Sequence, residues 1–67
     1  MNLSIIIPTL NEQVNIARLL NQLVKNENAE YYEVIVVDGG STDGTIDVVN
    51  QFPGVYCIRI HARVLLR

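Results

Sequence analysis

The 67-residue sequence lacks the covalent and metal-based devices that stabilise many small domains. It contains a single cysteine, Cys57, so no disulfide can form within the chain. It also contains a single histidine, His61, whereas a structural zinc site needs four cysteine or histidine ligands. A domain of this size buries only about 60% of the surface that its unfolded chain exposes. Self-association is the remaining route to extra stability, and we therefore expect a homo-oligomer.

The sequence also has no dominant charge and no long apolar run. Five basic and seven acidic side chains give a net charge of −2, so nucleic acid is not an expected partner. No segment approaches the roughly 20 apolar residues of a membrane span, and we expect none. The N-terminal sequence MNLSIIIPT has no basic region before its short apolar run, unlike a signal peptide. Together with a lone thiol, these absences favour a cytoplasmic protein.

The apolar residues that are present form three short runs separated by two helical patterns. Leu3–Ile7 and Val34–Val37 are rich in β-branched residues and typical of strands buried on both faces. A third run, Val55–Ile60, follows a Pro-Gly turn. The order β-α-β-α-β predicts an α/β Rossmann-like half-fold with a three-stranded parallel sheet. Because parallel crossovers are right-handed, we expect the strand order 3-2-1 with both helices on one face.

The first helical pattern lies between residues 9 and 26. Its apolar residues recur at helical spacing and are expected to face the core: Ile16, Leu19, Leu20, Leu23 and Val24. Thr9 and Glu12 have the spacing of a capping box, and Asn11 is an alternative N-cap.

The second helical pattern follows the glycine-rich segment after residue 38. Ser41 or Thr42 is the expected N-cap, and Asp43 would lie in the first turn, near the positive end of the helix dipole. The residues expected to face the core are Ile46, Val49 and Phe52.

With both helices on one face, the opposite face of an apolar sheet would be bare. We expect Ile5, Ile7, Ile35 and Val37, or their alternate neighbours, to meet water there. An apolar patch of roughly several hundred Å² is unusual on a monomer. The expected oligomer would be joined through this face or by pairing along the free edge of the first strand.

Two polar loops, PTLNE and DGGSTDGT, follow the first and second strands. Ligands of parallel α/β sheets bind outside the carboxyl ends of the strands, where both loops would lie. Asp38 would reach this rim, while Gly39 and Gly40 permit close backbone approach or positive φ. The spacing equally allows a purely structural turn that Asp38 and Asp43 cap. A P-loop and a dinucleotide fingerprint are excluded by the glycine spacing.

The segments SIIIPTLNEQVNI and YEVIVVDGGSTDGT resemble, in this order and at these strand ends, the opening of family 2 glycosyltransferases. Enzymes of this family have the GT-A fold. The resemblance covers residues 3 to about 60, nearly the whole chain, but only the first part of a complete family member.

Taken residue by residue, the resemblance implies a site for the nucleotide of a nucleotide-sugar donor. The segment after the first strand would line the pocket: Pro8, Thr9, Asn11 and Glu12. Asp38 would accept a hydrogen bond from a uracil-type base. Gly40, Ser41 and Asp43 would shape the pocket floor and cap the next helix. Gly39 stands where many members have a second aspartate, which removes one possible contact with the base or ribose.

The resemblance also implies two features that this sequence does not contain. Family members hold a divalent metal, Mn or Mg, on the donor diphosphate through a later Asp-x-Asp motif, and a later carboxylate is the catalytic base. Neither follows the third strand here, and His61 has no neighbour to orient it as a base. We therefore assign no catalytic or metal-binding residue, and expect a metal only in a complete family member.

These observations lead to a first expectation and two alternatives. We expect residues 1–67 to be a single truncated domain, with 61–67 as an uncertain tail: the donor-nucleotide-binding part of a glycosyltransferase. It would bind nucleotide or nucleotide-sugar weakly and be inactive alone. The first alternative is a non-catalytic α/β module that self-associates or binds a protein partner. The second is a stand-alone nucleotide-binding regulator.

Overall fold

The computed structural model describes residues 3–60 and contains the predicted β-α-β-α-β succession. Its elements are β1 (Leu3–Thr9), α1 (Gln13–Lys25), the 3-10 turn η1 (Ala29–Tyr31), β2 (Tyr32–Asp38), α2 (Thr45–Val49) and β3 (Val55–Arg59). The expectation of a tail at 61–67 lies outside the described residues.

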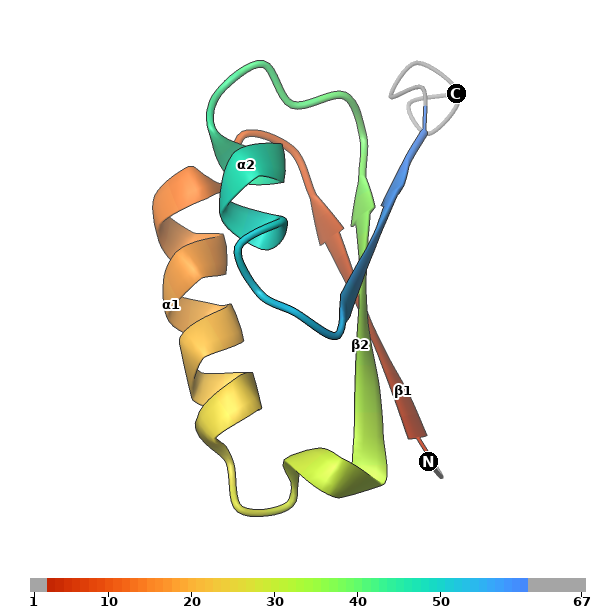
Figure 1. Cartoon of the computed structure of the whole chain (residues 1–67). Coiled ribbons are helices and arrows are strands. Elements are labelled where there is room, and N and C mark those ends of the chain that lie inside the picture. Colours follow the sequence, from red (N-terminus) through yellow and green to blue (C-terminus); the bar gives the residue numbers. More distant parts are fainter. Residues whose placement is uncertain (1–2, 61–67) are drawn as a thin grey trace.

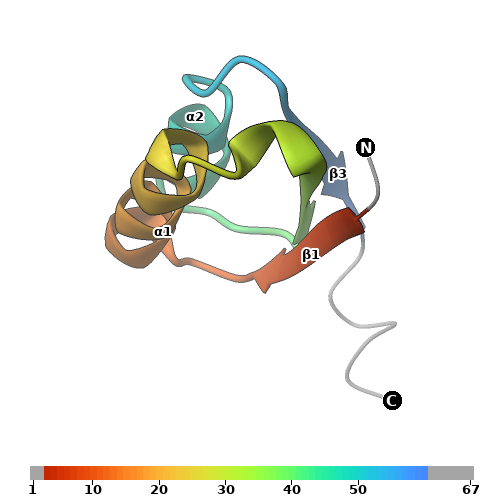
Figure 2. The same cartoon turned by 90° about the horizontal axis from the view of Figure 1, so that it is seen from below.

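The three strands form a parallel sheet in the order β1-β2-β3, with β2 in the centre. Read from the other edge this is the order 3-2-1, so the predicted topology is confirmed. Both helices lie on the same face of the sheet, as the two views at right angles show (Figures 1 and 2). Two successive right-handed crossovers in the same direction require this arrangement.

The core lies between this face of the sheet and the two helices. Its buried residues are Ile16 and Leu20 of α1, Val34 and Val36 of β2, and Val49 of α2. Apolar side chains at the margin are partly buried against this core, Ile7, Leu23 and Phe52 among them. The predictions of Ile16, Leu20 and Val49 as core residues are thus confirmed. Leu23 and Phe52 are partly buried, whereas the predicted Ile46 is not part of this core and its neighbour Val48 packs there instead.

The apolar stripe of α1 is wider than the surface that covers it. Leu19 is 38% exposed and Val24 is 42% exposed, although both were expected to face the core. In the described part of the chain, α1 packs against the sheet on one side and α2 on another. Two of its predicted core residues therefore remain in contact with solvent.

The predicted N-cap residues are wrong, but Asp43 does cap the second helix, since its Oδ1 accepts from the backbone amide of Thr45 (2.9 Å). The helix α1 begins at Gln13, and its N-cap residue Glu12 makes no side-chain capping bond, so no capping box forms. Thr9 is still the last residue of β1, with its side chain on the core side of the sheet. The helix α2 begins at Thr45 after Gly44, which places Ser41 and Thr42 too far upstream to cap it.

The opposite face of the sheet, which we call the helix-free face, is apolar. Two neighbouring rows across the strands form it: Ile6, Ile35 and Tyr56, then Pro8, Val37 and Ile58. Ile35 and Val37 were correctly assigned to this face. Ile5 and Ile7 were not, because they lie beside Val34 and Val36 on the helix side.

Replacement of a core leucine should destabilise so small a fold severely. Leu20 is 0% exposed, so Leu20→Ala should lower the free energy of unfolding by about 2–5 kcal/mol. Leu19→Ala on the same helix is the matched control and should cost about 1 kcal/mol or less, since Leu19 is partly solvated. Urea unfolding followed by circular dichroism measures both. Equal losses for the two variants would contradict this core.

Candidate functional site

The two polar loops meet at the carboxyl edge of the sheet, as predicted. Thr9 and Asp38, the last residues of β1 and β2, are paired in the sheet, so the loops that follow them begin side by side. Backbone pairing continues one step further, where the amide of Gly39 donates to the carbonyl of Thr9 (2.9 Å). The site is thus anchored on two adjacent strand ends.

The carboxylate of Asp38 is the centre of this edge and is 0% exposed. Its Oδ1 accepts hydrogen bonds from the hydroxyls of Thr9 (2.8 Å) and Ser41. Its Oδ2 accepts from the backbone amides of Gly40 (3.0 Å) and Ser41 (2.7 Å). An ionised carboxylate offers about four acceptor positions, so these donors occupy all of them.

The hydrogen bonds also set the charge state of Asp38. Burial of the carboxyl raises its pKa, but the hydrogen bonds from Ser41, Thr9 and Gly40 together lower it by more. The net result is a pKa below the usual 3.8. The group is therefore ionised at neutral pH. The buried charge is tolerated here because four oriented donors replace its hydration.

Beyond Asp38, the first loop donates backbone amides to side chains of the second. The three contacts are Asn11 N to Ser41 Oγ (2.8 Å), Glu12 N to Thr45 Oγ1 (2.9 Å) and Gln13 N to Asp43 Oδ2 (3.4 Å). Amides at the start of a helix have no partner within it. Those of α1 are therefore capped by residues roughly thirty positions away in the sequence rather than by a local capping box.

Backbone amides of the second loop donate in turn to side chains of the first loop and of the start of α1. The side-chain oxygen of Asn11 accepts from the amides of Thr42 (2.8 Å) and Asp43 (3.3 Å), and that of Gln13 accepts from Gly44 (3.1 Å). Asn11 adopts φ 53°, a left-handed conformation that asparagine tolerates better than most residues. The two loops consequently form one hydrogen-bonded unit.

One glycine is required for this geometry. Gly40 has φ 106°, which side-chain-bearing residues rarely adopt. A Cβ on Gly44 would lie 2.6 Å from Nε2 of Gln13, so a larger residue there would displace the end of this flexible side chain. Gly39 has no positive φ, and its backbone N–H donates a hydrogen bond to the carbonyl of Thr9.

The predicted site residues fall into a buried and an open group. The buried group is Thr9, Asp38, Gly39 and Ser41. The open group consists of the exposed residues Pro8, Asn11, Glu12 and Asp43, together with half-buried Gly40. All of them lie at one edge, but a base could donate to the carboxylate of Asp38 only by displacing one of its present donors. Contact with a nucleotide remains a prediction for every residue of both groups.

Two participating residues were missed by the sequence analysis. Thr45 is 0% exposed, accepts from Glu12 and donates to the carboxylate of Asp43. Gln13 contributes both its amide and its side chain. An Asp-x-Thr spacing before a helix is a local signal for Thr45, whereas nothing local indicates Gln13.

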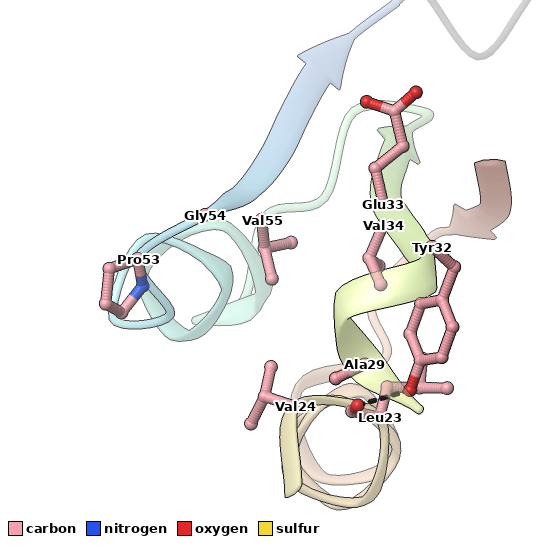
Figure 3. Close-up of a pocket in the computed structure, with 9 residues that line it drawn as sticks. All are labelled: Leu23, Val24, Ala29, Tyr32, Glu33, Val34, Pro53, Gly54 and Val55. Atoms are coloured by element: carbon pink, nitrogen blue, oxygen red, sulfur yellow. Dashed lines mark hydrogen bonds between the residues drawn. The ribbon is translucent and has the colours of Figure 1, made fainter. Parts of the chain in front are cut away.

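Two shallow grooves of similar size are lined by described residues. One, of about 180 Å³, lies between β1 and α1 and includes three predicted site residues, Pro8, Thr9 and Glu12, in its lining. The other, of about 190 Å³, lies at the opposite end of the sheet, where the hydroxyl of Tyr32 donates to the carbonyl of Leu23 (Figure 3). Of these two, the first adjoins the polar loops.

In residues 3–60, no three or more His, Cys, Asp or Glu side chains gather in a way that could hold a metal ion. Neither helix has the length and apolar character needed to cross a membrane.

The stability of the protein should depend on the charge of Asp38. Because its pKa is lowered in the folded state, its contribution is present above the unfolded value near 3.8 and is lost as pH falls below it. Asp38→Asn places an amide against four donors and should cost about 2–4 kcal/mol at pH 7. The free energy of unfolding of this variant should also fall less steeply between pH 5 and pH 2 than that of the unmodified protein.

Chemical unfolding across this pH range measures both effects. Asp47→Asn, at an exposed acid of α2, is the matched control and should leave the pH profile unchanged. A profile for Asp38→Asn as steep as that of the unmodified protein would show that Asp38 does not hold the loops.

Comparison with known proteins supports the resemblance drawn from the sequence. The model of the family "Glycosyl transferase family 2" matches residues 4–65. A putative glycosyltransferase TagX from Staphylococcus aureus is 43% identical over 53 residues, 79% of this chain and 14% of the relative. The glycosyltransferase AglE from Haloferax volcanii is 44% identical over 54 residues, 79% of this chain and 18% of the relative.

The chain thus spans less than a fifth of the length of these relatives. No solved structure matches it with comparable significance. The family match covers nearly all of the chain, including both polar loops and all three strands. The chain belongs to glycosyl transferase family 2 and corresponds to its N-terminal segment.

Proposed function

We propose that this chain forms the donor-nucleotide-binding part of a nucleotide-sugar-dependent glycosyltransferase. The observation that supports this most directly is the joining of both polar loops at the carboxyl edge of a parallel sheet, where such folds bind ligands. Membership of the glycosyltransferase family supplies the class of ligand. Since the matched part is a small share of the relatives, the activity of a whole enzyme is not attributed to this chain.

In this proposal the buried and open groups have different tasks. Asp38, Thr9 and Ser41 fix the loops, because their polar atoms are engaged with one another. The open group would meet the base and ribose. Its exposed acceptors include the carboxylates of Glu12 and Asp43, and the pKa of Asp43 is lowered by hydrogen bonds from Thr45, so it is ionised at neutral pH. These can accept from the imide and hydroxyl groups of a uridine nucleotide.

The same carboxylates oppose the diphosphate. Two anionic side chains on the rim repel a phosphate group, and no acidic cluster in residues 3–60 could hold the divalent metal that the family uses. The described residues do not fit that metal, and we derive no chemical step from it. The expected affinity is correspondingly low, with a dissociation constant near or above about 1 mM, or about −4 kcal/mol.

Titration of uridine diphosphate with magnesium into ¹⁵N-labelled protein tests the proposal. Amide shifts should concentrate in residues 9–12 and 39–43 and saturate only in the millimolar range. Amides of residues 29–33, at the opposite end of the sheet, are the internal control and should not move. Adenosine diphosphate should bind more weakly, because its base has no imide. A sugar-transfer assay with the purified chain should show no turnover.

Unchanged amides in both loops at saturating nucleotide would contradict the proposal and favour the non-catalytic module. Sugar transfer by the purified chain would contradict the expected lack of activity. The non-catalytic module remains the second candidate because the helix-free face exposes large apolar side chains, Ile6, Tyr56 and Ile58 among them.

A further inference from the structure

We infer that Asn11 is a positioning residue, which holds the second polar loop in its ligand-binding conformation and does not itself contact the ligand. This task rests on the nucleotide site proposed above and refines the assignment of one residue in it. The resemblance placed Asn11 in the lining of the nucleotide pocket, and the structure leaves it exposed at the same edge. Its hydrogen bonds, however, are directed at the other loop, which lies beside it (Figure 1).

The backbone of Asn11 has a conformation that the surrounding contacts must maintain. Its φ is 53°, and within residues 3–60 the other residues with positive φ are glycines. A left-handed backbone costs free energy in any residue with a Cβ, although asparagine tolerates it better than most. Such residues persist where the neighbouring structure holds them, and they are concentrated at functional sites. The conformation of Asn11 therefore calls for an account of what it achieves.

The side-chain oxygen of Asn11 is fully occupied by the second loop. It accepts from the backbone amides of Thr42 (2.8 Å) and Asp43 (3.3 Å), and an amide carbonyl has two lone pairs to offer. Two N–H donors that converge on one atom also identify this atom as the oxygen rather than the nitrogen. The backbone amide of Asn11 donates to Ser41 Oγ. The side-chain group left for a ligand is the NH2, which can only donate.

Asn11 holds the part of the second loop that the carboxylate of Asp38 does not bond. Asp38 fixes the turn directly after β2. The next two residues, Thr42 and Asp43, are exposed, and their amides donate to Asn11. The Asp43 carboxylate is one of the two proposed acceptors for the base and ribose. Without the oxygen of Asn11 this exposed stretch would have to be ordered when the nucleotide binds, which weakens binding.

Two substitutions separate positioning from direct contact. Asn11→Gly keeps the left-handed backbone accessible but removes the oxygen to which Thr42 and Asp43 donate. Asn11→Asp keeps an acceptor of the same shape and replaces the NH2 by oxygen, so it retains the bonds to the loop and abolishes donation to a ligand. The matched control is Asn28→Gly, which makes the same exchange at an exposed residue before η1, at the opposite end of the sheet.

Hydrogen exchange of the full chain without nucleotide tests the bonds to the loop. In Asn11→Gly the amides of Thr42 and Asp43 should exchange at least about tenfold faster relative to those of β2, because they lose their acceptor. Asn11→Asp should restore slow exchange, and Asn28→Gly should leave it unchanged. If Asn11→Gly does not fold, Asn11→Ser, whose side chain is one bond shorter, takes its place with the same expectation. Unchanged exchange in the folded variant would overturn the proposal.

Titration of uridine into the same ¹⁵N-labelled chains tests the effect on binding, since a nucleoside has no phosphate for the new carboxylate of Asn11→Asp to repel. The dissociation constant should rise at least about threefold in Asn11→Gly, and should stay within about twofold in Asn11→Asp and Asn28→Gly. Equal weakening in Asn11→Asp and Asn11→Gly, with slow exchange retained in the former, would show that the NH2 contacts the ligand and would overturn the proposal. An unchanged constant in Asn11→Gly would do the same.

Failure of this inference and failure of the proposed function are distinguishable. If neither uridine nor uridine diphosphate shifts the loop amides of the unmodified chain, the proposed function fails, and the ligand part of the task of Asn11 fails with it. Exchange at Thr42 and Asp43 still decides in that case whether Asn11 holds the loop, because no nucleotide is present in that measurement.

Discussion

The described structure depends on one buried charge, the carboxylate of Asp38. Four hydrogen bonds are needed to replace its hydration, and they come from the end of β1 and from the turn after β2. The loss of any one of them would leave a buried anion partly unsolvated, which costs several kcal/mol. The turn at Gly40 and Ser41 is fixed by this requirement, and Ser41 in turn receives the amide of Asn11 from the first loop.

This constraint explains how a small fold can present two loops in a defined geometry. The amide of Gln13, where α1 begins, donates to Asp43 of the second loop, and the amide of Thr45, where α2 begins, donates to the same side chain. Further bonds from Glu12 to Thr45 and from Gly44 to Gln13 hold α1, α2 and both strand ends together at one edge. The opposite face of the sheet has no such organisation. It is apolar and has no helix over it in residues 3–60.

The sequence predicted the strands, their order and the side on which the helices lie, because apolar runs and the handedness of crossovers determine these. It also identified Ile16, Leu20 and Val49 as core residues. The caps of α1 could not be predicted, since their partners are about thirty residues away and the local motif at Thr9 and Glu12 forms no capping box. The cap of α2 by Asp43 is local and was predicted. Ile5 and Ile7 were assigned to the wrong face because an all-apolar strand carries no alternation that distinguishes its sides.

Hydrogen exchange at the loop amides tests the central role of Asp38 most directly. Gly40 and Ser41 lie outside the helices and strands, and their amides donate hydrogen bonds to this carboxylate. The account predicts that at neutral pH they exchange as slowly as the amides of β2, through unfolding of the whole domain. It also predicts that Asp38→Asn accelerates their exchange far more than that of β2. Exchange at the rate of a free loop in the unmodified protein, with β2 still protected, would contradict the account.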